Sequence, residues 1–201
     1  MITASPPLVL ASASAIRAAL LRAAGVPIIV DAAAIDEAEA KASLRTAGAG
    51  AAATAEALAE LKAQRISRRH AGALVLGADQ VLECNGILFD KPADPAGARR
   101  QLLALRGRQH RLVSAIVLTR DGRRLWHHLG RASLTMRDFS ETFLDEYLRA
   151  AASAPSSVGG YQLEGLGAQL FADIDGDYFT ILGLPLLPVL DILREHGVLR
   201  S

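Results

Sequence analysis

The chain has 201 residues, of which 51% are hydrophobic and 21% charged, and a chain of this length can bury a full core without disulfides or a structural metal. Its 22 basic and 21 acidic residues give a formal net charge of +1, and its aromatic content is only 4%, so composition does not indicate a nucleic-acid-binding surface. The one cysteine, Cys84, excludes an internal disulfide and a cysteine-based zinc site.

The first half of the chain predicts alternating strands and helices. Residues 7–12 are typical of a buried strand, and a serine-containing loop then leads into a helix that ends at Gly25. Residues 26–33 predict a second strand, followed by an acidic loop at 36–39 and an Ala/Gly-rich stretch at 47–53 with the least regular structure. A helix is predicted over 54–70 with Thr54 as its cap, and a buried strand over 73–79 ends at Asp79.

The second half continues the alternation. Residues 77–92 predict a hairpin with an Asn-Gly turn, residues 94–107 a helix that begins with a capping aspartate and a proline, and residues 110–136 two or three antiparallel strands. A helix is predicted over 140–151, then a polar loop over 156–167, a hairpin over 168–182 and a last helix after 183–188. We therefore predict one α/β domain over residues 1–201, with a mixed, twisted sheet and flanking helices.

The N-terminal region does not predict a targeting or membrane segment. Residues 1–21 have no basic stretch ahead of the apolar run, and Arg17 interrupts that run. Together with the single cysteine, this pattern indicates a cytoplasmic protein with no membrane partner.

Several polar residues directly follow predicted strands, which is where open α/β sheets bind their ligands. Ser12, Ser14 and Arg17 follow the first strand, and the free backbone N–H groups at a helix start can bind phosphate. Arg17 can add two parallel hydrogen bonds to phosphate oxygens. A serine in this place is more often only a helix cap, so the pattern by itself leaves both interpretations open.

Two acids and two lysines form a second group of candidates. Glu37 lies in the acidic loop and Asp79 at the end of a strand, and Mg²⁺ bound to phosphates is typically held by one or two carboxylates. A carboxylate could instead deprotonate an attacking water. Lys62 and Lys91 could neutralise the charge of a pyrophosphate leaving group. Taken alone, each of these residues is more typical of an ordinary exposed surface.

Other catalytic motifs are absent from the sequence. It contains no GxxxxGK[ST] phosphate loop, no GxGxxG fingerprint at a strand–helix junction and no GxSxG nucleophile turn. Cys84 lies in the predicted hairpin without an evident histidine partner. A P-loop kinase or ATPase and a serine or cysteine hydrolase are therefore not indicated.

Five sequence blocks, in order and spacing, resemble the Maf (septum formation inhibitor) family, whose members are nucleoside triphosphate pyrophosphatases. The blocks are LVLASASAIRAALL, AAAIDEAEA, AELKAQRI, GADQVLECNGILFDKP and GGYQLEGLGAQLFADIDGDYFTILGLPL, and the resemblance spans residues 8 to about 195. It implies two lobes around a cleft, similar to the inosine triphosphate pyrophosphatases. It also implies hydrolysis of a nucleoside triphosphate to the monophosphate and pyrophosphate with a divalent cation, Mg²⁺ or Mn²⁺.

The resemblance assigns roles residue by residue. It implies that Asp79, Glu37 and Lys91 are catalytic and that Asp79 and Glu37 also hold the metal. It implies that the substrate is bound by Ser12, Ser14, Arg17, Lys62, Gln80 and Glu164.

Three positions divide the substrate classes of the family that the chain resembles. The dTTP and UTP branch carries arginine, threonine and glutamine there, the 7-methyl-GTP branch carries an aromatic residue, glutamine and glutamate, and this chain has Ile16, Gln80 and Glu164. A carboxylate can accept hydrogen bonds from guanine N1–H and N2–H₂ but repels the carbonyl oxygens of uracil. Ile16 cannot stack on a positively charged methylguanine as an aromatic ring would. We therefore predict a guanine-like triphosphate over dTTP, with the methylated form left open.

Two other functions are the alternatives. The family's name suggests a nucleotide-binding regulator of cell division or septum formation without significant catalysis, but the chain keeps Glu37, Lys62, Asp79 and Lys91, which favours an enzyme. A nucleic-acid binder would show salt-dependent binding of oligonucleotides, and the near-neutral charge disfavours it. Members of the family commonly form dimers, so the resemblance also implies a homodimer.

Overall fold

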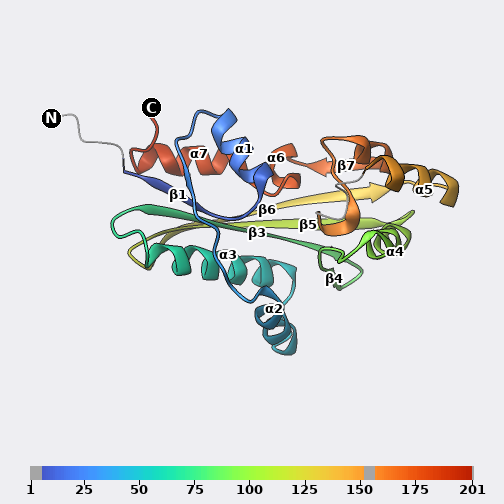
Figure 1. The fold of residues 1–201 in the computed structure, drawn as a ribbon, viewed down its shortest axis with the longest axis horizontal. Helices are drawn as coiled ribbons and strands as arrows, with labels where there is room; N and C mark the ends of the chain where they lie inside the picture. The colour runs from blue at the N-terminus through green and yellow to red at the C-terminus, as the bar shows by residue number, and fades with distance from the viewer. Residues whose placement is uncertain (1–5, 152–156, 201) are drawn as a thin grey trace. The chain divides into compact units, whose positions relative to one another are not determined.

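A computed structural model describes residues 6–151 and 157–200 of the chain. They form a seven-stranded mixed sheet with the strand order β2-β1-β3-β5-β6-β7, in which β4 pairs with β3 (Figure 1). The chain divides into two compact units: Met1–Gln80, Ser114–Gly130 and Gly183–Ser201 make the first, and Val81–Val113 and Arg131–Leu182 make the second. Three strands contribute residues to both units: β3 (Leu74–Cys84), β5 (Gln109–Arg120) and β6 (Arg123–Met136).

Parallel strands form the centre of the first unit. β1 (Leu8–Ala11) pairs with β2 (Ile29–Val30) on one side and with the first part of β3 on the other. The register of β1 and β3 runs to Ala11 opposite Gly77. β1 and residues 74–78 of β3 are apolar without alternation, as expected of parallel strands that are covered on both faces.

Helices cover both faces of these strands. Figure 1 shows α3 on one face of β1 and β3, and α1 and α7 on the other. The second helix, α2, contacts α3. The bounds of these helices are α1 (Ala15–Ala23), α2 (Glu37–Thr46), α3 (Ala51–Ser67) and α7 (Leu186–Glu195).

Small residues let α3 approach β3 closely. A Cβ added to Gly77 would overlap the carbonyl oxygen of Ala59 and would lie 2.8 Å from Cβ of Ala63. Ala59 and Ala63 are themselves fully buried. Only glycine fits at this position of the strand, and the close approach decides how near the neighbouring side chains of α3 come to β3.

The second unit contains a hairpin, a second antiparallel pair and several short helices. The last part of β3 pairs with β4 (Ile87–Phe89) across Asn85 and Gly86, whose φ angles of 52° and 79° are those that an Asn-Gly hairpin turn requires. The end of β6 pairs antiparallel with β7 (Phe171–Gly176). The helical elements are α4 (Pro95–Leu105), α5 (Glu141–Ala150), η2 (Val158–Gly160), η3 (Leu166–Leu170) and α6 (Tyr178–Ile181).

Many of the predicted elements are confirmed. They include β1, α1, the Asn-Gly hairpin, the two helices that begin after Asp94 and Ser140, and the last helix. Asp94 and Ser140 each accept a hydrogen bond from the backbone N–H three residues further on, as helix caps do. Among the helices of the described residues, none combines the length and the apolar character needed to cross a membrane.

The predicted acidic loop at 36–39 is wrong, because α2 begins there. Asp36 Oδ1 accepts a hydrogen bond from the backbone N–H of Glu39 at 2.9 Å, so Asp36 is the helix cap and Glu37 the first helical residue. Acids in the first turn also interact favourably with the helix dipole. The cap predicted at Thr54 is wrong as well, because the alanine run already forms α3 from Ala51 and Thr54 is buried inside it.

Three strand predictions also needed correction. The second strand was expected over 26–33, but β2 comprises only Ile29–Val30. The third was expected to end at Asp79, but β3 continues to Cys84 and joins the hairpin without a break. The hairpin expected over 168–182 is wrong: β7 is a single strand there, and α6 follows it with Asp177 as its cap, 2.7 Å from the backbone N of Thr180.

Candidate active site

The site is built where β1 ends and β3 continues. The last paired residue of β1 is Ala11, opposite Gly77, and Asp79 lies two residues further along β3. Side chains alternate along a strand, so Asp79 lies on the same face as Gly77, which is the face covered by α3. Asp79 lies inside β3, because that strand continues to Cys84. It nevertheless lies just beyond the carboxyl end of the neighbouring strand β1.

Lys62 of α3 joins two carboxylates. Its Nζ atom lies 2.7 Å from Oδ1 of Asp79 and 2.8 Å from Oε1 of Glu37. The side chains of Lys62 and Asp79 are 9% and 8% exposed, whereas that of Glu37 is 45% exposed. A charged group at this depth is tolerated only when it is paired, and the close packing of α3 on Gly77 brings Lys62 within reach of Asp79.

Asp79 keeps one oxygen without a partner. Its Oδ2 atom is buried and accepts no hydrogen bond from any part of the chain that the structure describes. Leaving such an atom unpaired costs about 1–3 kcal/mol, so the oxygen is suited to a water or a cation. The described residues contain no group of three or more His, Cys, Asp or Glu that could hold a metal, so a cation here would have two protein carboxylates.

Arg17 of α1 is buried and binds backbone carbonyl groups. Its Nε donates to the carbonyl oxygen of Gly183 at 2.7 Å, and its Nη1 donates to that of Ala78 at 3.0 Å and to Oγ of Ser12 at 3.1 Å. Burial lowers the pKa of Arg17, and the negative charges of Asp79 and Glu37 oppose that shift. Nε and Nη1 are committed to these contacts, and Nη2 is the guanidinium nitrogen outside them.

The two serines after β1 make local hydrogen bonds. Ser14 is the N-cap of α1, with its Oγ 3.3 Å from the backbone N of Arg17. Ser12 is buried, and its Oγ accepts from the backbone N–H of Ser14 at 3.3 Å as well as from Arg17. The cap interpretation of Ser14 is thus confirmed, while a contact of either serine with phosphate stays a prediction.

The other predicted residues lie apart from this cluster in the chain or serve different contacts. Gln80 follows Asp79 and donates from Nε2 to Oγ of buried Ser114 at 2.9 Å. Ile16 is half-buried on α1. Lys91 lies two residues after the end of β4 and Glu164 lies between η2 and η3; both are exposed and belong to the second unit. Their roles beside the first unit's residues stay predictions.

Sequence reasoning missed the groups that hold Arg17 and Gln80. Gly183 has a φ of 93°, which favours glycine, and a Cβ there would lie 3.2 Å from Nη2 of Arg17. The Gly-Leu-Pro signal before the last helix could have marked Gly183 as a special turn position. The carbonyl of Ala78 and the hydroxyl of Ser114 have no such signal, because any residue offers a carbonyl and serine is common in strands.

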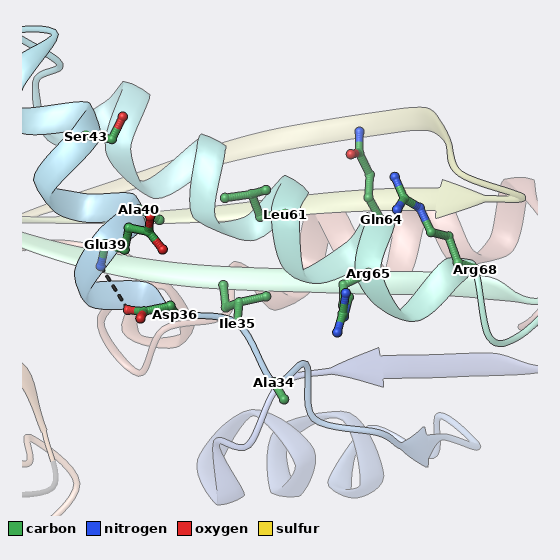
Figure 2. Close-up of a pocket in the computed structure, with 10 residues that line it drawn as sticks. All are labelled: Ala34, Ile35, Asp36, Glu39, Ala40, Ser43, Leu61, Gln64, Arg65 and Arg68. Carbon is green, nitrogen blue, oxygen red and sulfur yellow. Dashed lines mark hydrogen bonds between the residues drawn. The ribbon is translucent and has the colours of Figure 1, made fainter.

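A pocket of about 540 Å³ lies between α3 and the first turns of α2 (Figure 2). Leu61, Gln64 and Arg65 of α3 line it on one side, together with Arg68, the C-cap of that helix. The other lining residues are Ala34, Ile35, Asp36, Glu39, Ala40 and Ser43. Arg17, Lys62 and Asp79 do not line it, so the pocket and the buried cluster are separate features of the first unit.

The chain is similar over nearly its whole length to known proteins of one family. The model of the family described as Maf-like protein matches residues 7–196. A nucleoside triphosphate pyrophosphatase of Paramagnetospirillum magneticum is 60% identical over 191 residues, which cover 94% of this chain and 98% of that protein. One of Rhodospirillum rubrum is 53% identical, with 98% of each chain covered. A 7-methyl-GTP pyrophosphatase of Mesorhizobium japonicum is 50% identical over 96% of this chain and 97% of its own. The chain therefore belongs to the Maf family.

Proposed function

We propose that the chain hydrolyses a nucleoside triphosphate to the monophosphate and pyrophosphate. The observation that carries this proposal is the buried pair of Asp79 and Lys62, which Glu37 joins from a more exposed position, and in which the acid has an uncommitted oxygen and is paired with a cation. The names of relatives that match nearly the whole chain support the same reaction. A regulator of cell division without catalysis is not favoured, because these relatives are named as enzymes.

Asp79, Lys62 and Lys91 have different roles in this reaction. A water oxygen attacks the α-phosphorus, the bond from that phosphorus to the α,β-bridging oxygen breaks, and pyrophosphate leaves. Asp79 accepts the proton of the attacking water, since general bases need an accepting atom within hydrogen-bond reach. Lys62 and Lys91 neutralise the negative charge that grows on the pyrophosphate.

The start of α1 holds the phosphate groups. Ser12 and Ser14 directly precede the first turn of that helix, where backbone N–H groups and the helix dipole favour an anion. Arg17 contributes Nη2, because its other donors already bind Ser12 and two carbonyl groups. Arg17 thereby both fixes this turn and offers one charged donor to the substrate.

A divalent cation fits the carboxylate pair. Oδ2 of Asp79 is buried without a partner, and Glu37 is close enough to share Lys62 with Asp79. Mg²⁺ is usually held by one or two carboxylates, with phosphate and water in the remaining positions. Asp79 and Glu37 would hold the cation. When bound, Mg²⁺ or Mn²⁺ supplies Lewis-acid stabilisation of the phosphoryl oxygens.

A guanine-like base is the proposed substrate feature, in preference to thymine or uracil. Glu164 is exposed and can accept hydrogen bonds from guanine N1–H and N2–H₂, and Gln80 is held in place by Ser114. The measurement is a comparison of kcat/KM for GTP, 7-methyl-GTP, dTTP and UTP. Hydrolysis of dTTP or UTP at least as efficient as that of the guanine nucleotides contradicts this preference.

The same proposal includes a homodimer in the cytoplasm without nucleic-acid partners. The nearly balanced charge supports the absence of nucleic-acid partners, and the free buried thiol supports a cytoplasmic location. The homodimer follows from the family resemblance alone. Light scattering on a sizing column tests the dimer, and a monomeric mass at micromolar concentration contradicts it.

Pyrophosphate release is the decisive assay for the reaction. Asp79→Asn keeps the shape of the side chain and removes its charge, and we expect its rate to fall by about 100-fold or more. Asp173→Asn, at an exposed position of β7, is the matched control and should keep the wild-type rate. Equal rates for wild type and Asp79→Asn would reject the role of Asp79, and no release by the wild type from any triphosphate would reject the proposed function.

A further inference from the structure

In the structure, the ammonium group of Lys62 occupies the place between the two carboxylates of the site. Its contacts of 2.7 Å to Asp79 and 2.8 Å to Glu37 have the length of charge-assisted hydrogen bonds. Two of its three N–H donors are thereby committed to the same two carboxylate groups that a cation would use. Lys62 is itself 7% exposed, so water screens these contacts only weakly.

The charges of this cluster already balance. Two carboxylates, Asp79 and Glu37, face two cations, Lys62 and Arg17, and Arg17 is near enough to both acids to interact with them electrostatically. A divalent cation added to this arrangement would stand next to an ammonium group held in a low-dielectric setting. Like charges at such distances repel strongly, so the cation gains much less from the carboxylates while Lys62 remains in place.

We propose that Lys62 is a built-in counter-cation that keeps divalent metal off the Glu37–Asp79 pair until the phosphates of a bound nucleotide draw its ammonium group away. The inference rests on the proposed function, since it concerns the same carboxylates, and adds an order of events to it. Metal alone binds the free protein weakly, and metal and nucleotide bind with positive coupling. By linkage, each ligand raises the affinity for the other by the same factor.

The side chains of Lys62 and Asp79 differ in mobility. Lysine is a compact charge on a flexible four-carbon stem, so its ammonium can reach a different partner by rotation of the side chain. Asp79, by contrast, is fixed in the middle of β3. Lys62 binds only one oxygen of this carboxylate, because Oδ2 of Asp79 has no hydrogen-bond partner among the described residues.

Mn²⁺ binding to the nucleotide-free protein tests the inference without any activity measurement. Electron paramagnetic resonance counts free Mn²⁺ during titration of the wild type and of Lys62→Met. We expect Lys62→Met to bind Mn²⁺ at least tenfold more tightly. Arg22→Met, which removes one positive charge from an exposed position of α1, should bind like the wild type. Equal Mn²⁺ affinity in the wild type and Lys62→Met overturns the inference.

A second pair of variants covers the case in which Lys62→Met does not fold. Glu37→Gln and the double variant Lys62→Met/Glu37→Gln differ only in the lysine, and the double variant restores the local charge balance. The double variant should bind Mn²⁺ more tightly than Glu37→Gln, and equal affinity again overturns the inference.

A nucleotide titration tests the coupling. The α,β-methylene analogue of GTP, which cannot be cleaved between the α- and β-phosphates, should raise the Mn²⁺ affinity of the wild type by a larger factor than that of Lys62→Met. An equal factor in both proteins overturns the exchange, because metal–phosphate chelation alone would then explain the coupling. Neither result depends on pyrophosphate release, which separately decides the proposed function.

Discussion

Arg17→Lys separates the structural task of Arg17 from its contact with substrate. The substitution keeps the positive charge but replaces a planar fork by a single nitrogen, which cannot reach the carbonyl oxygens of Gly183 and Ala78 along the directions that Nε and Nη1 now use. Two buried carbonyl groups then lose their donor. At about 1–3 kcal/mol for each unsatisfied buried group, less what the ammonium recovers, we expect a loss of about 2–4 kcal/mol of unfolding free energy.

Urea unfolding of the nucleotide-free protein, followed by circular dichroism, measures this loss. Arg22→Lys is the matched control, because Arg22 is exposed in the last turn of the same helix, and it should change the unfolding free energy by no more than about 0.5 kcal/mol. KM should rise as well, because the substitution removes Nη2, the nitrogen proposed to bind the substrate. An Arg17→Lys protein that unfolds like the wild type, with only KM affected, would refute the reasoning and leave Arg17 as a phosphate ligand alone.

Two further predictions concern stability. Gly77→Ala should lower the unfolding free energy by about 1–3 kcal/mol and also reduce activity, since its Cβ pushes α3 away from Asp79. Gly50→Ala, at an open position with an ordinary φ of −77°, is a control for glycine replacement that should leave activity unchanged. Burial lowers the pKa of His110 to about 4, below its usual 6.5, so the unfolded state binds more protons between these pH values. The unfolding free energy should therefore fall by up to about 3 kcal/mol as pH drops from 6.5 to 4. His110→Gln should remove this part of the pH dependence, as measured by denaturation curves across the same range. An unchanged pH dependence in His110→Gln contradicts the assignment.

The parts of the fold that sequence predicted well carry strong local signals. The aspartate and proline before α4, the serine before α5 and the Asn-Gly turn each act through a few neighbouring residues, and each was placed correctly. The failures came where local signals competed. At 36–39 the run of acids indicated a loop, but Asp36 caps a helix that the following alanines favour.

The β7 region failed for a different reason. Asp175-Gly176 has the composition of a hairpin turn, yet β7 runs through Asp175 to Gly176 beside β6. Gly176 lies against Ala132, where a Cβ would come within 2.8 Å of the alanine Cα, so the glycine serves close strand packing there. A sequence pattern does not distinguish a glycine needed for a turn from one needed for space.

The identity of the site residues came from the family resemblance, and their contacts came only from the structure. Lys62 and Asp79 are seventeen positions apart on a helix and a strand, and their pairing depends on Gly77 and the alanines that let α3 approach. The partners of Arg17 are mostly main-chain oxygens, which no side-chain pattern encodes. Arg17 was predicted as a phosphate ligand, and its three hydrogen bonds within the chain add a structural task to that prediction.

The charge balance of the cluster has a consequence for how the substrate arrives. Each cation of the cluster, Lys62 and Arg17, already has partners in the nucleotide-free protein, so neither is an idle binding site for a triphosphate. A polyanion that brought no counter-charge would have to take Lys62 from two buried or half-buried carboxylates and leave them unpaired, which is costly in a poorly solvated place. A nucleotide that brings a divalent cation supplies a new positive charge to these carboxylates in place of that of Lys62. The protein should therefore bind the metal–nucleotide complex far better than the metal-free nucleotide. A chelator should raise the apparent Kd of the uncleavable analogue in the wild type. The increase should be smaller in Glu37→Gln, because this variant has one carboxylate fewer to leave unpaired.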